Sequence, residues 1–217
     1  MLTTYRTIGK SGEAELTIEK SQFIGYAAPA ATEEEALAFI QAIKKKHRDA
    51  THNVPAYVIG ENNDIQRFSD DGEPSGTAGV PMLEVLKKED VRDTVLVVTR
   101  YFGGVKLGTG GLVRAYTKAA KLALDAAGIV TCELHQIVQV KIEYTLLGFM
   151  QNQLRAHDYA IKDTLYTEMV ALLVWVPMEK VDVFLAQCVE WTNGRVDLER
   201  QELAYLERPA QAEKEGL

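Results

Sequence analysis

The second half of this 217-residue chain has a pattern of side chains that few folds can satisfy. Residues 136–145 alternate apolar and polar side chains, which is typical of a half-buried strand. Helical and alternating segments then follow in turn. In chain order we predict a strand at 136–145, a helix at 146–157, strands at 159–166 and 169–176, a helix from Pro177 and a strand at 195–206. The order βαββαβ predicts a ferredoxin-like domain.

The first half predicts further strands and helices in a less regular order. Thr32 followed by Glu35 forms a capping box, which marks the start of a helix. The expected elements are one or two strands within 14–28, a helix from Thr32, strands at 54–59 and 94–99, and a helix at 111–127. We therefore predict that this half forms a separate domain of mixed helices and strands.

The fold class predicted for the whole chain is α+β with two domains. We place the N-terminal domain at 1–134, the ferredoxin-like domain at 135–208 and a polar tail at 209–217. About 70 residues are sufficient for the second domain, and the tail from Pro209 is expected to be frayed.

The composition indicates a globular protein of the cytoplasm. The chain is 47% hydrophobic and 25% charged, which is ordinary for a folded protein. No apolar run approaches the roughly 18 to 20 residues that cross a bilayer. Residues 1–10 lack the apolar core of a signal peptide, so we expect neither membrane insertion nor export.

The two cysteines, Cys132 and Cys188, predict neither a disulfide nor a zinc site. They are far apart in the sequence and are not clustered with the four histidines, whereas zinc needs several adjacent thiolate or imidazole ligands. Cys188 lies in an apolar helical pattern and is expected to be a buried free thiol, which fits a reducing compartment.

The net charge of −7 excludes a protein that coats nucleic acid nonspecifically, because neutralising phosphates requires a basic surface. The charge is unevenly distributed. Residues 1–134 carry 16 Lys/Arg against 18 Asp/Glu, whereas residues 135–217 carry 8 against 13. A polyanion is therefore expected to bind only a local patch of the first half.

An acidic loop is predicted at residues 67–81. It contains three carboxylates, Asp70, Asp71 and Glu73, together with three glycines and two prolines that give it a defined shape. Carboxylates in such a loop suit a divalent cation. They are equally suited to capping turns and to pairing with arginine, and the sequence leaves both interpretations open.

A glycine-rich segment, residues 100–116, follows a predicted buried strand and leads into a helix. Backbone N–H groups at such a junction, aided by the helix dipole, can form a cradle for an anion. The glycines of this candidate phosphate site are Gly103, Gly104, Gly108, Gly110 and Gly111. The segment is neither a Walker A motif nor a convincing dinucleotide fingerprint.

The helix after the glycines carries a row of cations. Arg114, Lys118 and Lys121 fall at i, i+4 and i+7 and therefore share one face. Arg100 and Lys106 are expected to extend this row at the start of the helix. The row can attract phosphate on an otherwise acidic protein, or it can be a solvated helix face.

Residues 68–79, Phe-Ser-Asp-Asp-Gly-Glu-Pro-Ser-Gly-Thr-Ala-Gly, and residues 100–116 resemble the two signatures of the YigZ/Impact family. The resemblance spans the whole chain. It implies an N-terminal fold like the second domain of a small-subunit ribosomal protein and a C-terminal domain like the last domain of elongation factor G. Eukaryotic Impact proteins regulate translation control through protein partners. Val54 stands where many relatives are expected to have cysteine, so the resemblance implies no thiol role there.

Three functions follow from these patterns. The first is a translation-linked regulatory or binding protein whose partner is RNA, the ribosome or a translation-associated protein. The alternative is a metal-assisted enzyme that acts on a phosphorylated small molecule or nucleotide, with a divalent cation on Asp70, Asp71 and Glu73. In a third interpretation, the acidic loop pairs internally with Arg67, Arg100 and Arg114 and braces a protein-binding surface.

Overall fold

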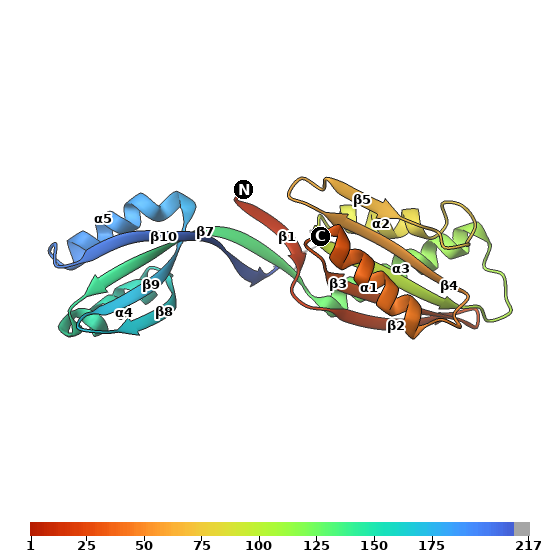
Figure 1. The fold of residues 1–217 in the computed structure, drawn as a ribbon, viewed down its shortest axis with the longest axis horizontal. Helices are drawn as coiled ribbons and strands as arrows, with labels where there is room; N and C mark the ends of the chain where they lie inside the picture. Colours follow the sequence, from red (N-terminus) through yellow and green to blue (C-terminus); the bar gives the residue numbers. More distant parts are fainter. Residues whose placement is uncertain (211–217) are drawn as a thin grey trace, which may run out of the picture. The chain divides into compact units, whose positions relative to one another are not determined.

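The computed structural model describes residues 1–210, which form two compact units (Figure 1). The first unit consists mainly of Tyr5–Thr131 and the second mainly of Cys132–Glu207. The change of unit falls within a single strand, β7 (Ile129–Ile142). The boundary predicted after residue 134 lies in the same strand.

The first unit is built on a five-stranded antiparallel sheet in the order β2-β3-β6-β4-β5. Its strands are β2 (Gly12–Ile18), β3 (Ser21–Pro29), β4 (His52–Ile59), β5 (Ile65–Phe68) and β6 (Thr94–Tyr101). The register places Arg100 of β6 between Phe23 of β3 and His52 of β4. Because side chains alternate along a strand, these three point to the same face of the sheet.

Three helices cover the sheet of the first unit (Figure 1). One face carries α1 (Glu33–Lys46), and the other carries α2 (Gly79–Lys88) and α3 (Gly108–Ala127). Helix α3 lies very close to β3 at Gly25, where a Cβ atom would be 2.5 Å from the carbonyl oxygen of Ala119. Within residues 1–210, no helix is both long and apolar enough to cross a membrane.

The second unit has the predicted ferredoxin-like arrangement. Its strands occur in the order β10-β7-β9-β8, and β1 (Thr4–Ile8) also pairs with β7. The remaining elements are α4 (Leu147–Ala156), β8 (Ala160–Tyr166), β9 (Val170–Pro177), α5 (Val181–Trp191) and β10 (Asp197–Pro209), with short 3₁₀ turns at Tyr144–Leu146 and Met178–Lys180. Buried residues of both helices and of β7 and β9 form its core, which includes Met150, Phe184 and Cys188.

Several predicted elements have different limits in the structure. The strand expected from residue 136 begins seven residues earlier, at Ile129, and the helix expected from residue 111 begins at Gly108. Strands β1 and β5 and helix α2 were not predicted from the sequence. Helix α2 had a usable signal, because Pro81 lies in its first turn and Met82, Leu83 and Leu86 recur at helical spacing. Of the predicted tail, residues 211–217 lie outside the described residues.

Candidate phosphate-binding surface

The acidic loop joins β5 to α2, and its first carboxylate caps that helix. Asp70 accepts hydrogen bonds from the backbone N–H groups of Gly76 (2.8 Å), Ala78 (3.1 Å) and Gly79 (2.8 Å). Burial acts to raise the pKa of Asp70, but the three N–H groups stabilise the carboxylate and hold its pKa below the ordinary value. Asp70 therefore stabilises the N-terminus of α2 and fixes the shape of the loop.

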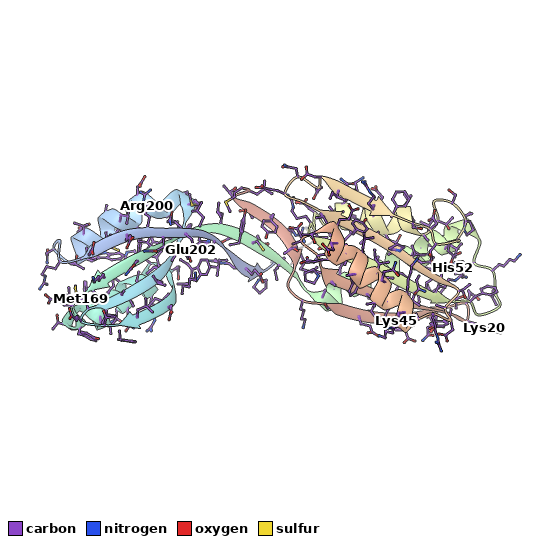
Figure 2. The ribbon with its side chains drawn as sticks, viewed as in Figure 1. Lys20, Lys45, His52, Met169, Arg200 and Glu202 are labelled. Atoms are coloured by element: carbon purple, nitrogen blue, oxygen red, sulfur yellow. The ribbon has the colours of Figure 1, made fainter. Side chains whose placement is uncertain are left out.

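The second carboxylate ties the loop to α1 and β4. Asp71 accepts a hydrogen bond from Lys44 Nζ through one oxygen (2.8 Å) and from the Asn53 backbone N–H through the other (2.7 Å). Its carbonyl oxygen lies 2.7 Å from His52 Nδ1, so this ring nitrogen carries the proton and donates. These bonds anchor the loop at one end of the sheet, near His52 in Figure 2.

The third carboxylate is buried and forms the shortest ion pair of the loop. Glu73 Oε1 accepts from Arg100 Nη1 at 2.6 Å and from the Tyr116 hydroxyl at 2.8 Å. His52 Nε2 lies 3.8 Å from Glu73 Oε2. Burial, and next the negative charge of Glu73, raise the pKa of Tyr116, so its hydroxyl stays protonated and donates. Glu73 thus joins the loop to both β6 and α3.

The three carboxylates do not converge on one point, because each has a different set of donors. In the part of the chain that the structure describes, no group of three or more His, Cys, Asp or Glu side chains is arranged to hold a metal ion. The geometry therefore gives no support to a shared divalent cation on Asp70, Asp71 and Glu73. The geometry agrees with internal bracing of the loop by Arg100, which pairs with Glu73. Arg67 instead lies near Glu33 of α1, with Nε 3.9 Å from Glu33 Oε1.

The candidate glycines are divided between a connection and a helix. Gly103 and Gly104 lie between β6 and α3, while Gly108, Gly110 and Gly111 belong to the first turn of α3. Gly103 is required by close packing, since a Cβ atom there would lie 2.0 Å from the backbone carbon and oxygen of Lys20. No side chain caps the N-terminus of α3.

The five predicted cations have different environments. Arg100 faces inward and is buried, because alternation along β6 turns it toward α3. Lys121 pairs with Glu89 (2.8 Å) and Asp125 (3.0 Å) on the surface. The other three, Lys106, Arg114 and Lys118, are exposed and make no ion pair with any residue from 1 to 210. The row on α3 is therefore free at its N-terminal end.

A second polar cluster, not predicted from the sequence, lies at the end of α1. The ring nitrogens of His47 lie 2.6 Å from the Tyr26 hydroxyl and 2.9 Å from the Tyr101 hydroxyl. Burial, and next the charge of Lys46, lower the pKa of His47. In the sequence, the only sign of this cluster is that polar side chains recur at alternate positions of the strands. The contacts of this cluster are internal, so it fixes the end of α1.

Replacing Asp70 with asparagine is expected to destabilise the first unit by about 1–3 kcal/mol at pH 7, since three backbone N–H groups, two of them at the buried residues Ala78 and Gly79, lose a charged acceptor. A carboxyl whose pKa is lowered on folding stabilises the protein above its unfolded pKa, here 3.8, and loses that effect as the pH falls through the folded value. The difference between wild type and variant should therefore shrink below pH 3.8. Urea unfolding at pH 7 and pH 3 measures it. Asp125→Asn, at an exposed ion pair, should change stability by less than about 0.5 kcal/mol at pH 7.

The fold and this surface define a class: a two-unit α+β protein with an internally braced acidic loop beside exposed cations, followed by a ferredoxin-like unit. Comparison with known families is consistent with that class. Residues 19–124 match the Impact N-terminal domain, and residues 140–195 match a domain of unknown function, DUF1949. The chain belongs to the Impact family.

Individual relatives extend over nearly the whole chain. The Impact family member YvyE of Bacillus subtilis (strain 168) is 49% identical over 215 residues, which cover 99% of each chain. The Impact family member YigZ of Escherichia coli (strain K12) is 37% identical over 193 residues, or 83% of this chain and 90% of the relative. A crystal structure described as that of a hypothetical protein is 33% identical, covers 93% of this chain and 99% of its own, and superposes with a TM-score of 0.59.

Proposed function

We propose that this protein is a translation-linked binding protein of the cytoplasm whose N-terminal unit contacts RNA phosphate. The observation that carries the proposal is the free row of cations, Lys106, Arg114 and Lys118, next to the glycine-rich connection. The link to translation comes from the resemblance to Impact proteins. If the partner on this surface is a protein and not RNA, the RNA-binding and ribosome-binding measurements below will give different results.

The acidic loop is compatible with this proposal because two of its three carboxylates are paired with cations. Asp71 is paired with Lys44 and Glu73 with Arg100, while Asp70 accepts hydrogen bonds from three backbone N–H groups. A carboxylate paired with a cation repels a phosphate much less than a free one would. The loop then braces the end of the sheet beside the cations.

Replacing Arg114 and Lys118 together with alanine is expected to weaken RNA binding by at least about tenfold near 0.1 M salt, because two phosphates are no longer neutralised. On a single strand, the slope of log affinity against log salt should fall by about 0.7 for each of these phosphates. Fluorescence anisotropy with a labelled RNA and co-sedimentation with ribosomes measure binding to the two partners.

Lys121→Ala is the matched control, because Lys121 lies on the same helix but is already paired with Glu89 and Asp125. It should leave both the affinity and the salt slope nearly unchanged. If the double variant sediments with ribosomes as well as wild type and binds RNA equally, the proposal is wrong. If RNA binding is absent in wild type while ribosome binding is lost in the double variant, the partner is a ribosomal protein.

A further inference from the structure

An exposed phenylalanine at the end of β6 rests on the buried guanidinium of Arg100. The Arg100 Cζ atom lies 5.4 Å from the centroid of the Phe102 ring and 5.4 Å from that of the Phe23 ring. Phe23 is fully buried, whereas Phe102 is 46% exposed. Since Arg100 is fixed by its ion pair with Glu73, it gives Phe102 a rigid, positively charged support.

The backbone around Phe102 is also fixed. The Phe102 N–H donates to Thr51 Oγ1 at 3.0 Å, and the Gly103 N–H donates to Ser21 Oγ at 3.2 Å. The next two residues, Gly103 and Gly104, have no side chains that could cover the ring. The half-exposed ring is therefore held in one place, because the backbone at Phe102 and Gly103 is hydrogen-bonded to the starts of both neighbouring strands.

Exposed cations lie on the chain segments that hold this ring in place. Ser21 follows Lys20, Thr51 follows Arg48 by three residues, and Lys106 belongs to the same connection as Phe102. None of these three cations forms an ion pair within residues 1–210. Figure 2 shows Lys20 and Lys45 at the same end of the unit as His52.

Two carboxylates, Glu19 and Asp49, lie on the same segments as these cations. Counting Lys45 with Lys20, Arg48 and Lys106, four exposed cations outside any ion pair in residues 1–210 stand against these two carboxylates. In the acidic loop at the same end, Asp71 and Glu73 are already paired with Lys44 and Arg100. This end of the unit is therefore locally positive on a chain whose net charge is −7.

We infer that Phe102 is a stacking platform for one base of a single-stranded RNA whose phosphates contact Lys20, Arg48 and Lys106. This inference rests on the proposed function and specifies the form of the RNA. A base inside a duplex has both faces covered by its neighbours, whereas a single strand offers a free face to an aromatic ring. Aromatic rings interleaved with cations are the arrangement by which proteins hold single strands without reading their sequence.

The test compares two labelled probes by fluorescence anisotropy: a ten-nucleotide oligoadenylate RNA and a ten-base-pair RNA duplex. Wild type is expected to bind the single strand more tightly. Phe102→Ala should weaken single-strand binding by roughly tenfold and leave duplex binding unchanged, since stacking contributes to the first alone. Phe102→Trp should retain single-strand binding, and its fluorescence should be quenched when a base stacks on it.

Phe68→Ala is the matched control, because Phe68 is 48% exposed in β5 of the same unit and should have no effect on either probe. Equal weakening of both probes by Phe102→Ala, or no weakening, would overturn the stacking platform while leaving the phosphate contacts of Arg114 and Lys118 intact. Absence of RNA binding by wild type would overturn the proposed function, and the inference with it. Unchanged melting temperatures of the variants exclude unfolding as the cause of a loss.

Discussion

Glu73→Ala is expected to destabilise the first unit by about 3–5 kcal/mol, the typical cost of removing one partner of a buried ion pair. The variant leaves the Arg100 guanidinium buried without its carboxylate, and the Tyr116 hydroxyl loses its acceptor. Total stabilities of domains are about 5–15 kcal/mol, so this loss removes a large share. The acidic loop should also separate from β6 and α3, because Glu73 is the residue that joins them.

The two units can be followed separately in one experiment. Both tryptophans, Trp175 and Trp191, lie in the second unit, so tryptophan fluorescence reports on that unit alone. Circular dichroism reports on both units. In urea, Glu73→Ala should shift the dichroism transition assigned to the first unit and leave the fluorescence transition in place.

Glu84→Ala is the control for Glu73→Ala, because Glu84 pairs with Lys87 on the surface of the same unit. Its effect should stay below about 1 kcal/mol, as for other exposed pairs. If Glu73→Ala were no more destabilising than Glu84→Ala, the buried pair would not hold the loop. Glu73→Gln keeps the shape and an acceptor for Tyr116, so it should lose less than the alanine variant.

Phe184→Ala is expected to destabilise the second unit by about 3–5 kcal/mol, because it removes a fully buried ring and leaves a cavity. Phe184 packs against Tyr159, with ring centroids 4.6 Å apart, and lies in the core formed by α4, α5 and the sheet. For this variant the fluorescence transition should move to a lower urea concentration. The dichroism transition of the first unit should stay at the same urea concentration.

The same variant tests which unit binds RNA. Under conditions where the second unit of Phe184→Ala is unfolded, RNA binding through Lys106, Arg114 and Lys118 should persist. Val183→Ala is the matched control, since Val183 is exposed on the same helix and should change stability by less than about 0.5 kcal/mol. A loss of RNA binding that follows the fluorescence transition would assign the binding surface to the second unit and contradict the proposal.

Much of the second unit could be predicted from the sequence because each element carries its own periodicity. The alternation over 136–142 and the helical spacing of Met150 and Leu154 report local geometry, and the structure has the same order of elements. The start of α1 could also be predicted from neighbouring residues alone. Thr32 Oγ1 accepts from the Glu35 N–H at 3.2 Å, as a capping box requires.

The candidate surface was only partly predictable for the opposite reason. The acidic loop and the glycine segment meet in the structure through the ion pair of Glu73 with Arg100. The environment of each charge depended on partners far away in the chain: Arg100 pairs with Glu73, 27 residues earlier. A row of five cations drawn from spacing alone included two, Arg100 and Lys121, that are already paired.

Local patterning thus determined the order of elements in the second unit, the α+β class and the position of the unusual segments, but it did not reveal β1, β5 or α2. The tertiary structure alone decided which charges are buried and which are free. The reason is that the register of β6 between β3 and β4 turns Arg100 inward to Glu73 and leaves Phe102 on the surface above it. Strand register depends on contacts across the sheet, and no spacing within one segment encodes it.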